Sequence, residues 1–136
     1  METPCDDLRS FISDLDEAGE LIKVEAELSP SFEIAAALRY LDRRTDKAIL
    51  FSRVKGYTIS IVGNLFQSYR SIATAFGITD GRKVLDEYLK RGSARIKPEI
   101  ENSGPVKEVI LKGDIDLLKV MPVLTHHEKD AGPYFS

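Results

Sequence analysis

The feature of this sequence that most constrains its fold is an alternation of short apolar runs with longer segments of helical periodicity. The short runs are strand-like and cover residues 21–24, 48–51, 58–62 and 106–111. The longer segments repeat apolar residues at spacings of three and four, which is typical of amphipathic helices that pack on a core. This alternation predicts a small α/β (or α+β) fold in which three to four helices pack on a mixed β-sheet.

Capping residues and glycines predict where the helices begin and end. The predicted helix starts, two of which precede a proline, are Thr3, Ser29, Ser68 and Thr79. The predicted ends are Gly19, Gly77, Gly92 and a position near Arg44. The apolar positions of the helices and strands predict a core of Leu8, Phe11, Ile12, Leu15, Ile34, Leu38, Ile61, Val84 and Leu85.

The chain of 136 residues has the size of one ordinary domain. Residues 93–105 contain two prolines, a glycine and few apolar side chains, which predicts a linker before the last predicted strand. We divide the chain into a domain at 1–112 and a connecting segment at 113–136. The connecting segment stops within an apolar phrase, so we expect a truncated chain whose residues 121–136 are poorly ordered or pack against a neighbouring molecule.

Composition and charge exclude several classes of protein. No apolar run reaches the roughly 18 residues of a membrane-spanning helix, and the N-terminus lacks the features of a secretory signal. The single cysteine, Cys5, cannot form an internal disulfide, which favours a cytoplasmic location. Residues 34–100 carry a net charge of +7, but their basic side chains are too dispersed to predict nucleic-acid binding.

Two histidines and a glutamate near the C-terminus are the first candidates for a metal site, because imidazole and carboxylate groups are common metal ligands. In an extended segment, however, His126 and Glu128 lie on one face and His127 lies on the other. The chain has no other histidine that could complete the site. We therefore interpret the cluster as a polar loop.

Three further features could carry chemistry, and we interpret each as structural. Asp114 and Asp116 could serve acid–base catalysis or bind a cation, but the preceding Gly113 favours a turn. Residues 63–68 could bind an anion at a helix start, but they match no phosphate-binding motif and are typical of a strand-to-helix turn. Cys5 is interpreted as an unreactive thiol. We assign no catalytic, cofactor-binding or metal-binding residue in this chain.

Four phrases of the sequence together resemble the N-terminal part of the UbiD family of decarboxylases. They are a DLR-x-F…GEL phrase at 7–21, IVGNLF at 61–66, PVKEV at 105–109 and a longer phrase that extends from 117 to 134. The phrases occur in the order that the family shows and cover nearly the whole chain. The resemblance implies that a complete relative adds a split β-barrel, which binds prenylated FMN, and a C-terminal domain used in oligomerisation.

The resemblance also implies an activity for the complete relative. Such enzymes remove or add CO2 at aromatic or α,β-unsaturated carboxylic acids, using the flavin together with a divalent metal and potassium. The family's catalytic and metal-binding residues lie beyond the phrase that here is Gly132-Pro133-Tyr134. The resemblance therefore implies a non-catalytic N-terminal domain of a carboxy-lyase, whose partners are the flavin-binding and C-terminal domains. The alternative is a stand-alone accessory or interaction module of the same fold.

Overall fold

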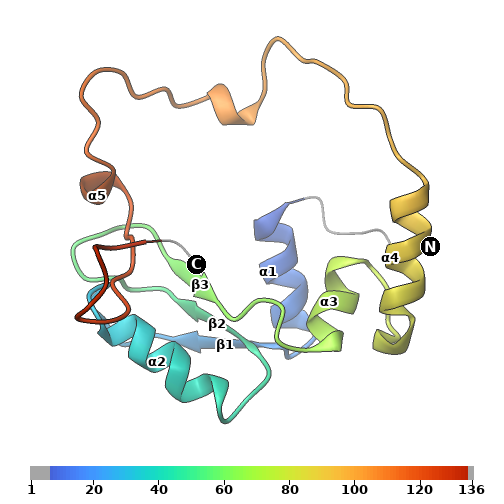
Figure 1. Ribbon diagram of the computed structural model, residues 1–136, viewed down its shortest axis with the longest axis horizontal. Helices are drawn as coiled ribbons and strands as arrows, with labels where there is room; N and C mark the ends of the chain where they lie inside the picture. The colour runs from blue at the N-terminus through green and yellow to red at the C-terminus, as the bar shows by residue number, and fades with distance from the viewer. Residues whose placement is uncertain (1–6, 135–136) are drawn as a thin grey trace.

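The computed structural model describes residues 7–134, and a three-stranded mixed sheet with the order β1-β2-β3 lies at its centre (Figure 1). The strands are β1 (Leu21–Val24), β2 (Ala48–Phe51) and β3 (Ile61–Gly63). Strands β1 and β2 are parallel, with Leu21 opposite Ala48, whereas β2 and β3 are antiparallel, with Ile49 opposite Gly63. The predicted α/β class and the predicted pairing of the second and third strands are confirmed.

Residues 7–134 also form five α-helices and two short 3-10 helices. They are α1 (Leu8–Glu17), α2 (Glu33–Asp42), α3 (Tyr69–Ala75), η1 (Gly81–Lys83), α4 (Val84–Ser93), η2 (Pro105–Lys107) and α5 (Leu117–Val120). Helix α2 joins the two parallel strands, which cannot be connected by a tight turn. Figure 1 shows α2 on one side of the sheet and α1 beside α3 on the other. In this part of the chain, no helix has the length and apolar character needed to cross a membrane.

Buried side chains form two clusters on opposite faces of β2. The first cluster, covered by α2, consists of Ile34, Ile49, Phe51 and Val54. The second cluster, covered by α1, consists of Phe11, Leu15 and Ala48. Because successive residues of a strand point to opposite faces, Ala48 and Ile49 belong to different clusters. The central strand β2 is therefore buried between helices on its two faces.

The predicted core is confirmed at most of its positions. The predicted residues that are buried or partly buried are Phe11, Ile12, Leu15, Ile34, Leu38, Ile61 and Val84. The prediction is wrong for Leu8 and Leu85, whose exposed fractions are 52% and 63%. Leu8 is the first residue of α1, beyond the reach of the second cluster, and Leu85 lies on a face of α4 that the described elements leave largely uncovered.

Local hydrogen bonds define the starts of α1 and α3. The carboxylate of Asp7 accepts a bond from the backbone N–H of Ser10 at 2.8 Å, and the Ser10 hydroxyl oxygen accepts one from the backbone N–H of Asp7 at 3.0 Å. Ser68 and Ser71 form the same reciprocal arrangement at α3. Both pairs are capping boxes, which satisfy backbone N–H groups that have no partner inside the helix. The start predicted at Ser68 is confirmed.

Glycines end two of these helices as predicted, while the end predicted at Gly92 is wrong. Gly19 and Gly77 have φ values of +70° and +63°, the left-handed conformation that follows a last helical turn. Helix α4 instead continues through Gly92 to Ser93. Asp7 is the N-cap of α1; Thr3, where a helix start was predicted, and Cys5 lie outside the described residues.

The start of α2 differs from the prediction at Ser29. The helix begins at Glu33, after Phe32, whose φ of +70° is unusual for a residue with a side chain. The carboxylate of Glu33 reaches back to accept a bond from the Ser29 N–H at 2.6 Å, and the Ile34 N–H donates to the Ser29 carbonyl at 3.2 Å. Because these contacts hold residues 29–32 in a turn, the serine–proline signal does not start the helix there.

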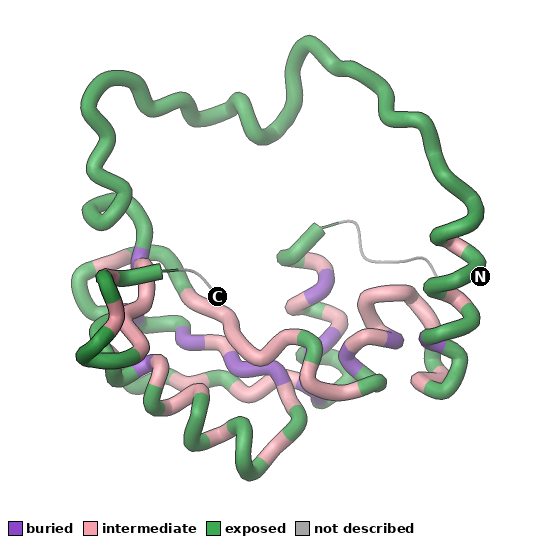
Figure 2. Tube along the Cα trace, in the orientation of Figure 1, coloured by how far each residue is buried: buried purple, intermediate pink, exposed green. Residues whose placement is uncertain are grey.

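The strand predicted at 106–111 is wrong. Residues 105–107 form η2, and no other strand of the described chain lies beside this segment. The side chains of Val106 and Val109 are 90% and 76% exposed. Figure 2 shows the whole stretch after α4 as an exposed arch, which leaves the folded body and returns to it at α5. A strand-like sequence without a neighbouring strand has no partner for its backbone groups and does not form a sheet.

The segment after α5 returns to the body of the domain. Leu124 packs against the first cluster, and Thr125 forms an isolated parallel bridge with Ser31. The backbone N–H of Tyr134 donates to the Leu124 carbonyl at 2.9 Å. We expected residues 121–136 to be poorly ordered or to pack against a neighbouring molecule, and this is wrong for the described part of the segment, which packs on its own domain. Phe135 and Ser136 lie outside the described residues.

Candidate functional site

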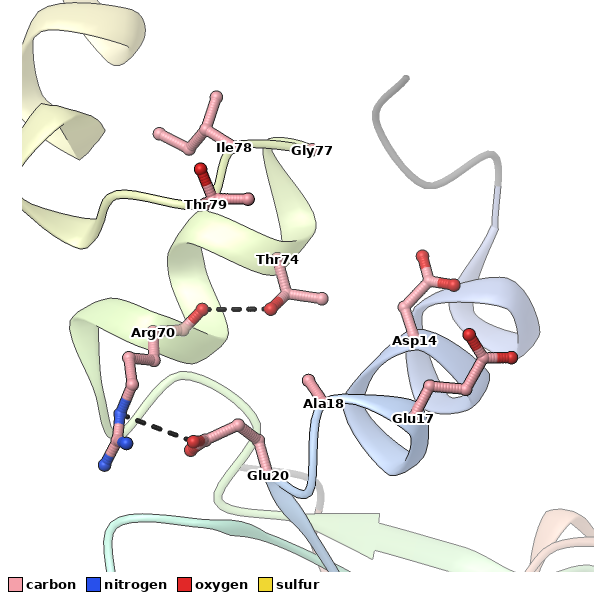
Figure 3. Close-up of a pocket in the computed structure, with 9 residues that line it drawn as sticks. All are labelled: Asp14, Glu17, Ala18, Glu20, Arg70, Thr74, Gly77, Ile78 and Thr79. Atoms are coloured by element: carbon pink, nitrogen blue, oxygen red, sulfur yellow. Dashed lines mark hydrogen bonds and ion pairs between the residues drawn. The ribbon is translucent and has the colours of Figure 1, made fainter. Parts of the chain in front are cut away.

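A groove of about 670 Å³ lies between α1 and α3 (Figure 3). We call it the α1–α3 groove, and its lining residues are Asp14, Glu17, Ala18, Glu20, Arg70, Thr74, Gly77, Ile78 and Thr79. Three carboxylates and one guanidinium group line this groove, so its wall carries a net negative charge. Such a surface favours cations over anions.

Glu20 is the most deeply buried charged residue of the groove, because its backbone is fixed at the edge of the sheet. Its N–H donates to the Leu15 carbonyl at 2.8 Å, and its carbonyl accepts from the Ala48 N–H at 3.0 Å. These bonds place its side chain, which is only 7% exposed, between α1 and α3. Carboxylates are rarely buried to this extent unless they are paired with a cation.

Arg70 supplies the paired cation, but it leaves half of the Glu20 carboxylate without a donor. Its Nε atom lies 3.3 Å from Oε1 of Glu20, and its Nη2 atom lies 3.6 Å from Oδ2 of Asp46. Oε2 of Glu20 is buried and has no hydrogen-bond partner. A buried acceptor without a donor typically costs about 1–3 kcal/mol. The arginine is thus shared between two carboxylates and saturates neither.

A second cavity of about 370 Å³ lies between the loop before β3 and the C-terminal segment. Its lining is mostly apolar and includes Leu38, Ile61, Met121, Leu124, His126 and Tyr134. The rings of His126 and Tyr134 lie against each other, with their centroids 4.8 Å apart. No lysine or arginine lines this cavity. It is therefore a largely hydrophobic recess whose polar lining includes His126, and the Nε2 atom of this histidine is buried without a hydrogen-bond partner.

The structure does not bring the histidine–glutamate cluster together as a metal site. The backbone N–H groups of His126 and His127 both donate to Oδ2 of Asp130, at 3.2 and 2.7 Å, which folds the segment into a turn. The side chains of His127 and Glu128 are exposed. Within residues 7–134, no three histidine, cysteine, aspartate or glutamate side chains are placed to hold a metal ion.

The two aspartates of the predicted turn have separate surroundings. Asp116 is the N-cap of α5, where its Oδ1 atom accepts from the Leu118 N–H at 3.1 Å and its Oδ2 atom lies 3.3 Å from Lys119. Asp114 is exposed and lies in the bend before this cap. Bonding of Asp116 to a nearby backbone amide is the behaviour expected of an aspartate in a turn or cap.

Residues 63–68 connect β3 to α3. A side chain on Gly63 would collide with Leu38, since an added Cβ would lie 2.6 Å from its Cδ2 atom. Asn64 takes the left-handed conformation with a φ of +58°, and the Ser68 hydroxyl accepts from the Ser71 N–H at 3.0 Å. These residues thus serve chain reversal, close packing and helix capping. Cys5, the last sequence candidate, lies outside the described residues.

The pair of Glu20 and Arg70 was not identified from the sequence as a site. The available signal was a glutamate placed between a helix-ending glycine, Gly19, and an apolar strand. A charged residue at such a position is drawn toward the sheet and needs a partner. The sequence does not reveal the partner, because Arg70 lies far along the chain on α3.

Comparison with known proteins places this fold among carboxy-lyases. The chain matches the model of the 3-octaprenyl-4-hydroxybenzoate carboxy-lyase N-terminal domain over residues 12–91. It is 30% identical over 138 residues to a phenolic acid decarboxylase of Sedimentibacter hydroxybenzoicus, and the match covers 96% of this chain and 29% of that protein.

Solved structures show the same relationship. An evolved dimeric form of the UbiD-class enzyme HmfF from Pelotomaculum thermopropionicum, in complex with prFMN, is 33% identical with a TM-score of 0.79. The vanillic acid decarboxylase of Sedimentibacter hydroxybenzoicus in open form, with truncated ShVdcD, is 30% identical with a TM-score of 0.82. Each match covers 93% of this chain and 29% of the other chain. The chain thus spans less than a third of the length of these relatives.

Proposed function

The chain belongs to the UbiD family, and we propose that it serves as the N-terminal domain of a decarboxylase acting on aromatic or α,β-unsaturated carboxylic acids. The observation that carries this proposal is the extent of the match, which includes almost all of this chain but only 29% of the phenolic acid decarboxylase. In this proposal residues 1–112 form the domain, and residues 113–136 connect it to the parts of the enzyme that hold the cofactor.

The lining of the two cavities among the described residues supports a cofactor site outside this chain. The α1–α3 groove presents three carboxylates, which repel a phosphate group, and the second cavity has no cationic side chain in its wall. Within the described range no three metal-ligating side chains converge. We therefore propose that the flavin, a divalent metal and potassium are bound by other domains of the enzyme, and we derive no catalytic step in this chain.

Exposed apolar side chains support a role as a docking domain. Leu85, Tyr88 and Leu89 of α4 are each at least 60% exposed, and Ile96 and Ile100 of the arch are more than 90% exposed. Exposed apolar surface on this scale is typical of surfaces that contact another domain or subunit. We propose that this surface packs on the other domains of the enzyme. The domain then forms one wall of the substrate cleft or moves to close the cleft. We further propose that the complete enzyme is a homo-oligomer located in the cytoplasm.

The proposal is tested by exchanging domains between relatives. The matching N-terminal part of the Sedimentibacter vanillic acid decarboxylase is replaced by this chain, and CO2 release from vanillic acid is measured after loading with prenylated FMN. We expect the chimera to bind the flavin and release CO2, and we expect this chain alone to release none above the free cofactor. Two results together would instead favour the alternative of a stand-alone accessory module. In the first, the chimera binds flavin but releases no CO2, and in the second, the isolated chain is monomeric and releases none either.

A further inference from the structure

Residues 108–112, which we call the arch segment, lie on the exposed arch between η2 and α5 (Figure 2). The segment has an acidic residue at its first position, a basic residue at its last and three apolar residues between them: Glu108, Val109, Ile110, Leu111 and Lys112. Each of the three apolar side chains is at least 56% exposed. Within residues 7–134 no strand pairs with this segment. A short apolar run whose backbone groups are unpaired is a template for pairing with another strand.

The arch segment is complementary to itself when two copies run in opposite directions. With Ile110 of one copy opposite Ile110 of the other, Glu108 lies opposite Lys112 of the second copy at both ends of the pair. In the same arrangement Val109 lies opposite Leu111. Opposite charges and apolar side chains that face each other across antiparallel strands both stabilise the pair. Two parallel segments in the same register would instead place Glu108 opposite Glu108, which is destabilising.

The neighbouring antiparallel registers lose this complementarity. Side chains opposite each other lie on the same face of a strand pair, so a symmetric pair can be centred on a residue next to Ile110 but not between two residues. A pair centred on Val109 places Glu108 opposite Ile110, which leaves the carboxylate without a cation. A pair centred on Leu111 places Glu108 opposite Asp114, which brings two carboxylates together. The sequence therefore favours the register centred on Ile110.

The groups that this pairing needs are available on the arch. The side chains of Glu108 and Lys112 are exposed, and neither takes part in an ion pair of the described residues. The N–H of Glu108 donates to the Pro105 carbonyl at 3.1 Å, which ends η2. In the described chain, the N–H groups of Val109 and Leu111 have no hydrogen-bond partner. These two residues can therefore exchange backbone hydrogen bonds with a second copy.

We propose that two copies of this chain associate by antiparallel pairing of their arch segments, with Ile110 on the two-fold axis and Glu108 paired with Lys112 of the second copy. Both copies use the same edge of the segment, so the contact is closed at two copies. A two-stranded ribbon of this length is only marginally stable in water, so the association depends on concentration. The proposal is independent of the decarboxylase proposal, since it uses neither a cofactor nor the apolar residues of α4.

Sedimentation velocity of the purified chain over a range of concentrations at low ionic strength tests the proposal. We expect an equilibrium between monomer and dimer. Glu108→Lys and Lys112→Glu should each weaken dimerisation by about tenfold, because each places like charges opposite each other at both ends of the pair. An equimolar mixture of the two variants should form a heterodimer about as readily as the unaltered chain forms its dimer, because both pairs of opposite charges return.

Ile110→Glu places two carboxylates at the centre of the pair and should abolish dimerisation. Ile100→Glu is the matched control, since Ile100 is exposed on the same arch but lies outside the arch segment, and it should leave dimerisation unchanged. Circular dichroism should show that every variant is folded, because all four substitutions replace exposed side chains. Three results would each overturn the proposal: a chain that stays monomeric at the highest concentration, equal effects of Ile110→Glu and Ile100→Glu, or a mixture of the charge variants that associates no better than either alone.

Discussion

Thr125 pairs with Ser31, which lies 94 positions earlier in the chain. The N–H of Thr125 donates to the Pro30 carbonyl at 3.1 Å, and the N–H of Phe32 donates to the Thr125 carbonyl at 2.9 Å. These two bonds hold the C-terminal segment against the turn that precedes α2. The bridge also brings Leu124, the residue before it, onto the first cluster.

Removing the Leu124 side chain should therefore destabilise the domain, although the residue lies in the segment assigned to the domain connection. We expect Leu124→Ala to lower the free energy of unfolding by about 1–2 kcal/mol, because a partly buried leucine loses its contact with the core. Leu118→Ala is the control, since Leu118 is 48% exposed on α5 and should change stability by no more than about 0.5 kcal/mol. Urea unfolding followed by circular dichroism measures both, and equal effects would contradict the packing of Leu124.

The two leucines of the predicted core that differ most in burial give a second test. Leu15 is fully buried, so Leu15→Ala should cost about 2–5 kcal/mol through lost contacts and the cavity left behind. Leu85 is 63% exposed, so the same substitution there should change the free energy of unfolding by no more than about 0.5 kcal/mol. Thermal unfolding of the two variants should show a large shift in Tm only for Leu15→Ala.

One substitution should have opposite effects at two glycines. Gly19 has a φ of +70°, so Gly19→Ala forces a Cβ into the left-handed conformation and should destabilise by about 1–2 kcal/mol. Gly92 lies inside α4 with open space around it, so Gly92→Ala should stabilise by about 0.5–1 kcal/mol. Chemical denaturation measures both, and a stabilising Gly19→Ala would contradict the left-handed end of α1.

Asp80 provides a test by pH. Hydrogen bonds from the Arg82 side chain and backbone N–H lower the pKa of Asp80 below its usual 3.8. A carboxyl group with a lowered folded pKa stabilises the fold above its unfolded pKa, and this contribution is lost as the pH falls through the lower folded value. We expect Arg82→Gln to return the pKa of Asp80 toward 3.8, while Lys83→Gln changes it much less. Carbon-detected NMR titration of the Asp80 carboxyl group distinguishes the two variants.

The sequence predicts those parts of the fold that depend on neighbouring residues. Ser68 caps α3, and Gly19 and Gly77 end their helices, because each of these interactions spans only a few positions. The start of α2 could not be predicted in the same way. Besides the local bonds of Ser29 with Glu33 and Ile34, its turn makes two backbone bonds with Thr125, which lies far along the chain.

Local sequence patterns also predicted burial for side chains that the structure leaves exposed. Val106 belongs to a strand-like run, and Leu85 belongs to a helical apolar face, yet neither is covered within the described residues. The spacing of apolar residues predicts which face of a helix or strand can be buried. Whether that face is buried depends on a neighbouring element that covers it. The pairing of Glu20 with Arg70 was also beyond local patterns, because it joins the beginning of β1 to α3.

The arch between α4 and α5 can be cut without separating the two parts of the chain that it joins. Its first end continues from α4, and its second end is held by Leu124 and Thr125, so both ends are attached to the same body. The arch is therefore a loop of the chain whose two ends are held together by non-covalent contacts within the folded body. A single protease cut within the arch should leave a nicked protein whose two fragments stay associated, and the two pieces produced separately should reassemble at the Ser31–Thr125 bridge.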